Sequence, residues 1–181
     1  MKTTLMNLIL GAAILASGAA AAATSEAKAV FEQAKDRASA DYKAALARCK
    51  SITGNPKDVC VAEAKAMRVR TTEEANALYR NTLKAYTQSR LKIADAYYDL
   101  DKVKCAALTG NDKDVCVQQA KATLVAAQAD ARADKKAIEA RTDAREDKRT
   151  AEYKVAIEKC DAFAGAAKDS CVGAAKTQFG K

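Results

Sequence analysis

One tyrosine and two cysteines recur three times along the chain with the same spacing, and this frame limits the folds that the chain can adopt. In each copy a tyrosine precedes the first cysteine by 7 residues, and the second cysteine follows 11 residues later. The copies begin at Tyr42, Tyr98 and Tyr153, so they start 56 and then 55 residues apart. All six cysteines of the chain belong to this frame. A motif repeated at a fixed period indicates one structural unit that is used several times.

Each copy has the pattern of a helix, a tight turn and a second helix. Between Thr24 and Gly165 the sequence has one glycine per copy, at Gly54, Gly110 and Gly165. A glycine just after a helix adopts the left-handed backbone conformation that closes it. These glycines therefore predict hairpin turns near 54, 110 and 165.

The residues after the first turn predict a helix start. Asn55 suits the capping position, Pro56 suits the first helical position, and Asp58 places a carboxylate at the positive end of the helix dipole. Asn111 repeats the cap in the second copy, whereas Ala166 stands there in the third. The third turn is therefore the least well specified.

These turn positions predict four helices, because the stretches between the turns contain no other glycine or proline after Pro56. The predicted ranges are 25–53, 56–109, 111–164 and 167–179. The two middle helices would be antiparallel and about 80 Å long at 1.5 Å per residue. The turns at Gly54 and Gly165 would then share one end, with Gly110 at the other. A break near Thr71–Thr72 or within 130–150 would give separate hairpins, and this alternative stays open.

Composition supports an all-α fold of long antiparallel helices, similar to a coiled coil, with little core. Alanine and the straight-chain charged residues are strong helix formers, and aromatic residues are only 5% of the chain. Two runs have the spacing of buried helix seams: Phe31, Ala34, Ala38, Tyr42, Ala45, Cys49 and Ile52, and then Tyr79, Leu83, Tyr86, Ile93, Tyr97 and Leu100 with Arg90 as the weak position. The range 130–149 has only Ile138 as a large apolar side chain, so we expect it to be the least well packed.

The cysteines of each copy flank the turn, which places them opposite each other in an antiparallel hairpin. Of the 15 pairings that six cysteines permit, the repeat therefore favours one. The predicted disulfides are Cys49–Cys60, Cys105–Cys116 and Cys160–Cys171. Each would close a loop of about a dozen residues and contribute roughly 3 kcal/mol in the chain-entropy model. Such crosslinks would substitute for the core that the composition does not supply.

Metal binding and thiol exchange are the alternatives for these cysteines. The chain has no histidine and no C-x-x-C pair, so the usual zinc, haem and redox spacings are missing. Tyr42, Tyr98 and Tyr153 share a helix face with their cysteines, and we expect their rings to pack beside the disulfides. We expect neither a metal nor another cofactor.

The N-terminus has the pattern of a secretory signal peptide. Lys2 is followed by an apolar run from Leu5 to Ala16 and by small residues up to Ala23. The run is shorter than the roughly 20 residues that a spanning helix needs. We therefore predict a signal peptide over 1–23, a helical repeat region over 24–181, and a periplasmic or secreted protein. An uncleaved membrane anchor is the alternative.

Charge and missing motifs limit the function. The formal net charge is +8, and removal of Lys2 leaves +7, which favours anionic partners such as lipopolysaccharide, acidic wall polymers or nucleic acid. Acidic residues are interspersed, so a solvated helix surface is the plainer interpretation. The chain lacks histidine, a nucleophile elbow and a phosphate-binding glycine loop, so we expect no enzyme activity.

The third copy resembles a known group of proteins. Its residues 153–161, YKVAIEKCD, and 168–172, KDSCV, are similar to those of small exported Ala/Lys-rich helical repeat proteins of proteobacteria, some of which are likened to TolA. The resemblance covers the Tyr–Cys–Cys frame and the signal peptide, and it implies no catalytic residues. Because the N-terminal membrane helix of TolA has no counterpart here, an energy-transducing role is not implied.

These observations favour a non-enzymatic protein with a structural or interaction role in the cell envelope. Two alternatives are a periplasmic holdase-type chaperone and a thiol-based stress- or metal-responsive protein. The sequence leaves the partner and the oligomeric state open.

Overall fold

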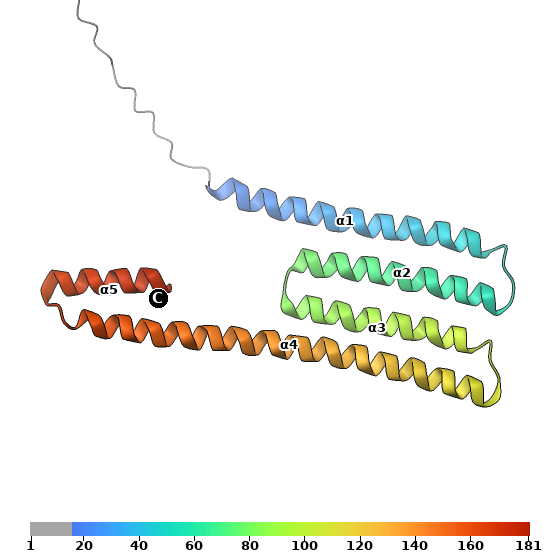
Figure 1. Ribbon diagram of the computed structural model, residues 1–181. Helices are drawn as coiled ribbons and strands as arrows, with labels where there is room; N and C mark the ends of the chain where they lie inside the picture. Colours follow the sequence, from blue (N-terminus) through green and yellow to red (C-terminus); the bar gives the residue numbers. More distant parts are fainter. Residues whose placement is uncertain (1–15) are drawn as a thin grey trace, which may run out of the picture. The chain divides into compact units, whose positions relative to one another are not determined.

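The computed structural model describes residues 16–181, with side chains from residue 25 onward, and this part of the chain is helical with no strand. Its five helices are α1 (Ala16–Cys49), α2 (Asn55–Arg80), α3 (Leu83–Cys105), α4 (Gly110–Cys160) and α5 (Gly165–Phe179) (Figure 1). The predicted all-α fold with disulfide-joined hairpins is confirmed. The chain divides into two units, residues 1–124 and 125–181, and α4 runs through the division.

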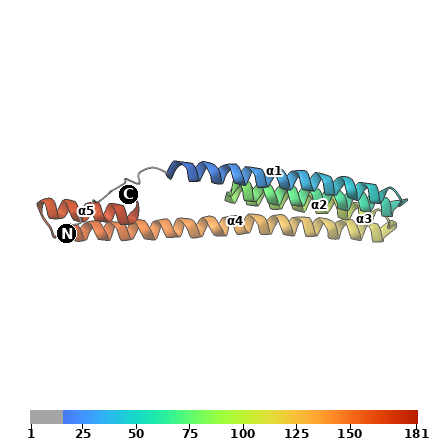
Figure 2. The ribbon, with the colours of Figure 1, turned by 90° about the horizontal axis from the view of Figure 1, so that it is seen from above.

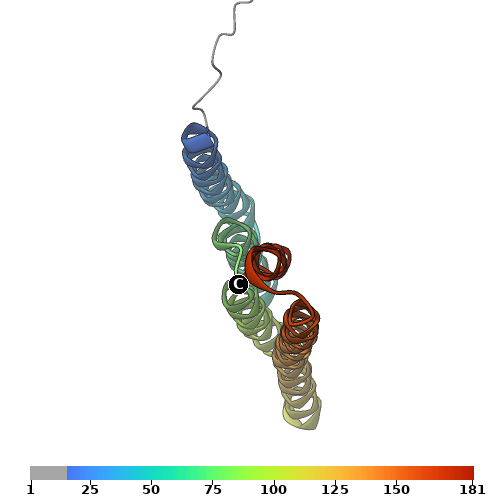
Figure 3. The same ribbon diagram turned by 90° about the vertical axis from the view of Figure 1, so that its left-hand side faces the viewer.

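In the first unit α2 packs against both α1 and α3, so these three helices form a layer one helix thick (Figures 1 and 3). The predicted seam of α1 is confirmed, since every residue from Phe31 to Ile52 in that series is buried or half-buried. Most of the buried side chains are alanine or cysteine, and Leu100 is the only buried large aliphatic one among the described residues. A single layer of alanine-rich helices has a thin core, as the composition predicted.

The prediction of one helix over 56–109 is wrong, because the chain turns back at Asn81 and Thr82. Asn81 has φ 45° and ψ 44°, in the left-handed region, and its backbone N–H donates to the carbonyl of Ala77. The Thr82 side chain accepts a hydrogen bond of 3.1 Å from the N–H of Ala85 and so caps α3. Asparagine tolerates the left-handed conformation and threonine is a good N-cap, so this pair ends one helix and starts the next without glycine or proline. The break lies outside both positions that we had left open, near Thr71–Thr72 and within 130–150.

This extra turn also changes where the other turns lie. Because α2 and α3 are antiparallel, the turns at Gly54 and Gly110 lie at the same end of the first unit (Figure 1). The expectation that Gly110 lies at the opposite end from Gly54 is therefore wrong. The predicted seam from Tyr79 to Leu100 is interrupted as well, since Tyr79 and Tyr86 are 41% and 39% exposed.

The three turn glycines have positive φ, of 65°, 56° and 55° at Gly54, Gly110 and Gly165. They do not close the preceding helices as we expected, because each of those helices ends five residues earlier, at its disulfide cysteine. Asn55, however, does not cap α2. Gly54 occupies the cap position with no side-chain hydrogen bond, and Asn55 is the first residue of the helix. Its side chain is directed to α3 instead, because the end of that helix presents a carbonyl within reach.

In the second unit α5 folds back along the last turns of α4 (Figure 2). α4 has 51 residues and is one helix, so the break considered within 130–150 does not occur. We expected 130–149 to be the least well packed range, and residues 136–149 are exposed, with Ile138 44% exposed. Ala131, in contrast, is 1% exposed. We call residues 136–149 the uncovered segment.

No helix in the described range is both long and apolar enough to cross a bilayer. Residues 1–15 of the predicted signal peptide lie outside the described range, and residues 16–23 are part of α1. Cleavage after Ala23 stays a prediction.

Candidate functional site

Each of the three turns is closed by a disulfide between the helix before it and the helix after it. The bonds join Cys49 to Cys60, Cys105 to Cys116, and Cys160 to Cys171, with Cα–Cα distances of 5.7, 5.6 and 5.6 Å. The first cysteine of each pair is 1% exposed. No cysteine in the described range has a free thiol. The disulfides therefore fix the hairpins, and each is shielded from solvent on one side.

We expected the frame tyrosines to pack beside the disulfides, and the contacts that their rings make differ from copy to copy. The guanidinium of Arg68 lies 4.4 Å from the ring centre of Tyr42, and the ammonium of Lys102 lies 4.6 Å from that of Tyr98. Tyr153 instead meets Phe179 edge to face, with ring centres 6.0 Å apart. The rings thus pack around the hairpins, two under a cation and one against an aromatic ring.

A groove with a volume of about 1000 Å³ lies between α2 and α3. At one end the Asn55 side chain donates a hydrogen bond of 2.9 Å to the carbonyl of Val103. In its wall the ammonium of Lys92 forms a 2.8 Å ion pair with Oε1 of Glu73. The groove is lined by four acidic and three basic side chains together with apolar ones, and this mixture of charges favours a solvated cleft between paired helices over a binding site for one charge type.

Glu73 is the one buried charge of this groove whose hydrogen bonding is incomplete. Only 15% of its side chain is exposed, whereas 59% of the Lys92 side chain is exposed. Its second oxygen, Oε2, is buried and accepts no hydrogen bond from the described residues. Burial of a carboxylate costs free energy unless a cation pairs with it. The ion pair with Lys92 therefore offsets the cost of burying Glu73.

A second contact ties α1 to α2 in the same unit. The rings of Phe31 and Tyr79 stack with centres 5.0 Å apart and planes 4° from parallel. Lys35 lies over the outer face of Phe31, 5.1 Å from the ring centre. This stack joins the middle of α1 to the last turn of α2, well away from the Cys49–Cys60 disulfide.

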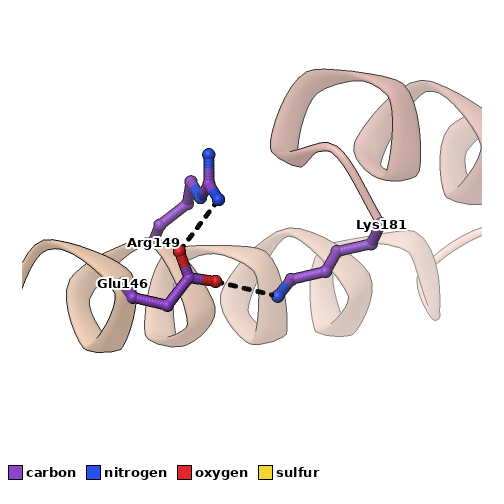
Figure 4. Close-up of polar contacts among 3 residues, drawn as sticks. All are labelled: Glu146, Arg149 and Lys181. Carbon is purple, nitrogen blue, oxygen red and sulfur yellow. Dashed lines mark hydrogen bonds and ion pairs between the residues drawn. The ribbon is translucent and has the colours of Figure 1, made fainter. Parts of the chain in front are cut away.

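The resolved pKa shifts all arise from exposed ion pairs. A hydrogen bond with Lys181 lowers the pKa of the Glu146 carboxyl, and Arg149 adds to the effect (Figure 4). Hydrogen bonds with Asp99 and Asp161 raise the pKa values of Lys102 and Lys168, respectively. Each shift stabilises the form that is already charged at neutral pH, so none of them prepares a group to transfer a proton.

Arg70 shows the same behaviour. Its pKa is raised by a hydrogen bond with Glu74 and, to a lesser extent, by Tyr97. Its Nε lies 2.8 Å from the Glu74 carboxylate, one helical turn away. A guanidinium is charged at any relevant pH, so this shift prepares no group for proton transfer.

Among residues 25–181 no three histidine, cysteine, aspartate or glutamate side chains gather in an arrangement that could hold a metal ion. The features with chemical character are therefore the three disulfides, the α2–α3 groove and the charged surface of α4. The six predicted cysteines are joined within their own hairpins. The Lys92–Glu73 and Asn55–Val103 contacts were missed, because both depend on the turn at Asn81 and Thr82.

Comparisons with protein-family models, curated proteins and solved structures gave no match to this chain.

Proposed function

We propose that this protein acts outside the cytosol as a non-enzymatic helical spacer or binding protein of the cell envelope. The observation that carries the proposal is that every cysteine is in a disulfide within its own hairpin. Disulfides form and persist in oxidising compartments, and exported proteins with small cores rely on them. The resemblance of the Tyr–Cys–Cys frame to exported helical repeat proteins supports the same placement.

The partner that suits the surface of α4 is an anionic polymer or lipid of the envelope. Arg141, Arg145 and Arg149 recur every four residues, so they form one ridge of the uncovered segment, and all three are exposed. The excess of basic over acidic residues in the whole chain adds attraction at long range. Contacts of this kind are electrostatic and weaken as salt screens them.

The test of the partner is binding to vesicles that contain lipopolysaccharide, at low and at high salt. We expect binding that decreases with salt and weakens at least about tenfold, roughly 1.4 kcal/mol, when the three ridge arginines are replaced by alanine. A control variant replaces three exposed basic residues elsewhere, Lys28, Lys43 and Lys121, by alanine and has the same net charge. If both variants weakened binding equally, the attraction would be nonspecific and the ridge would not be the binding site. Unchanged binding by the ridge variant would also contradict the proposed role of the ridge.

The alternatives make different predictions for the same protein. A thiol-responsive protein needs free cysteine thiols, whereas all six cysteines are paired here. A holdase should suppress the aggregation of a denatured outer-membrane protein, which light scattering measures directly. We expect no suppression at equimolar ratio, and suppression would replace the proposal with the chaperone function.

A further inference from the structure

Four alanines of α4 form a stripe that continues into the uncovered segment. Ala133, Ala137, Ala140 and Ala144 recur at intervals of four, three and four residues, and all four are exposed. This is the spacing of the seam positions of a coiled coil. Alanine at these positions lets two helices approach closely, but a stripe of small residues does not by itself select a partner.

The charges beside the stripe do select one. Lys136 and Asp143 lie along one edge, seven residues apart, and Asp134 and Arg141 lie along the other edge, also seven residues apart. Along each edge, therefore, one heptad step changes the sign of the charge. All four side chains are exposed.

We propose that this face of α4 is the interface with a second copy of the chain, packed antiparallel. A twofold axis between residues 138 and 139 brings Ala137 opposite the partner's Ala140, and Ala133 opposite the partner's Ala144. In an antiparallel pair, each edge of one helix meets the same edge of the other.

In this register each edge brings opposite charges together. Lys136 faces the partner's Asp143, and Asp134 faces the partner's Arg141. The twofold axis repeats both pairs, so four ion pairs flank the alanine layers.

The same charges disfavour the competing arrangements. A shift of one heptad in one direction brings Asp143 against the partner's Asp143, and in the other direction Lys136 against the partner's Lys136. A parallel pair would place Lys136 beside the partner's Arg141. Repulsion in the alternatives gives specificity as effectively as attraction in the favoured register.

The interface is short. One layer beyond the stripe, Asp130 would meet the partner's Asp147, and this repulsion ends the contact at both ends. Specific interfaces of small area are typically weak, so we expect a dimer with a dissociation constant on the order of micromolar that depends on salt. This inference does not rest on the proposed envelope function, and the two surfaces share Arg141. Sedimentation without lipid or polymer therefore tests the association of identical chains alone.

The experiment is sedimentation velocity of the oxidised full-length mature chain between about 1 μM and 1 mM. We expect a monomer–dimer equilibrium. Lys136→Glu and Asp143→Lys should each weaken it at least about tenfold, because each places like charges together twice. The double variant exchanges the two charges and should restore the dimer, and a mixture of the two single variants should form heterodimers.

Lys121→Glu is the matched control, since it makes the same change of charge at an exposed position outside the stripe. It should leave the dimer unchanged, and circular dichroism should show the same helix content in all variants. A monomer at every concentration would overturn the proposal. A dimer that ignores charge reversal, or a double variant as weak as the single ones, would overturn it as well.

A photo-crosslinking residue at position 137 provides a readout of the register. The proposal predicts crosslinks to the second copy around Ala140, mapped by mass spectrometry. Crosslinks around Ala137 itself would indicate a parallel pair and contradict it.

Discussion

The side-chain amide of Asn55 donates a hydrogen bond of 2.9 Å to the carbonyl of Val103, which joins the start of α2 to the end of α3 across 48 residues of sequence. The acceptor lies in the last turn of α3, and the same carbonyl also accepts a hydrogen bond of 3.2 Å from the backbone N–H of Ala106. This contact holds together the two turns at one end of the first unit and closes one end of the α2–α3 groove.

Replacement of Asn55 by alanine should therefore destabilise the first unit. We expect a loss of about 1 kcal/mol in the free energy of unfolding, because one hydrogen bond of a half-buried amide is removed. Urea denaturation followed by circular dichroism measures it. Asn111→Ala changes the corresponding exposed residue of the second copy and should have an effect within about 0.5 kcal/mol. Equal effects of the two variants would contradict a tertiary role for Asn55.

Replacement of Phe31 by alanine should weaken the packing of the α1 turns around Phe31 against α2. The stack with Tyr79 is lost, and with it about 1–2 kcal/mol of ring packing and apolar burial. Hydrogen exchange should become faster in the turns of α1 around Phe31 but not near Cys49, which the disulfide holds. Phe163→Ala, at a phenylalanine that is 53% exposed, is the control and should leave exchange in α1 unchanged. If exchange became faster by the same factor along the whole of α1 in the Phe31→Ala variant, the stack would not be what holds the turns around Phe31.

The ion pair between Lys92 and Glu73 should have an asymmetric effect on stability. Lys92→Met leaves a largely buried carboxylate without its cation, and we expect it to cost about 1–3 kcal/mol. Glu73→Gln should cost less, and combining it with Lys92→Met should recover most of the loss. Lys104→Met removes an exposed pair with Asp101 and should cost less than about 1 kcal/mol. A double variant as unstable as the sum of the two single ones would rule out coupling between Lys92 and Glu73.

The contact between Lys181 and Glu146 should depend on pH and salt. Because Lys181 and Arg149 lower the pKa of Glu146, the contact contributes fully above the ordinary pKa of a glutamate. It is lost as the pH falls through the lowered pKa of Glu146. A carboxyl titration by NMR should show the pKa of Glu146 rising in Lys181→Ala and at high salt. Lys135→Ala removes the cation of the Glu139 pair instead and should not affect Glu146. An unchanged titration in Lys181→Ala would contradict the contact.

The all-helical fold, the three glycine turns and the α1 seam could be predicted because each depends on residues close together in sequence. Gly54, Gly110 and Gly165 require a left-handed conformation that few other residues adopt readily, so their positions indicate the turns directly. The pairing of the cysteines follows from the turns, since residues at similar distances on either side of a hairpin turn face each other.

The break at Asn81 and Thr82 could not be predicted with the same rules. Asparagine and threonine also occur within helices, and the break depends on how α3 packs back on α2, where Ala77 and Ala85 are each 3% exposed. The Lys92–Glu73 and Asn55–Val103 contacts join residues on α2 and α3, so their pairing requires the position of that turn. The pair Asn-Thr within a long helical run was the available signal, through a residue that tolerates the left-handed conformation followed by a good N-cap.

Three disulfides that each lock one hairpin underlie both the fold and the proposed placement outside the cytosol. Their pairing can be measured by peptide mapping of the protein purified from cells, with its free thiols trapped by alkylation. We predict that no cysteine is alkylated and that the linked peptides contain Cys49 with Cys60, Cys105 with Cys116, and Cys160 with Cys171. Alkylated cysteines, or linked peptides that join different copies, would contradict both the clamped hairpins and the proposed placement outside the cytosol.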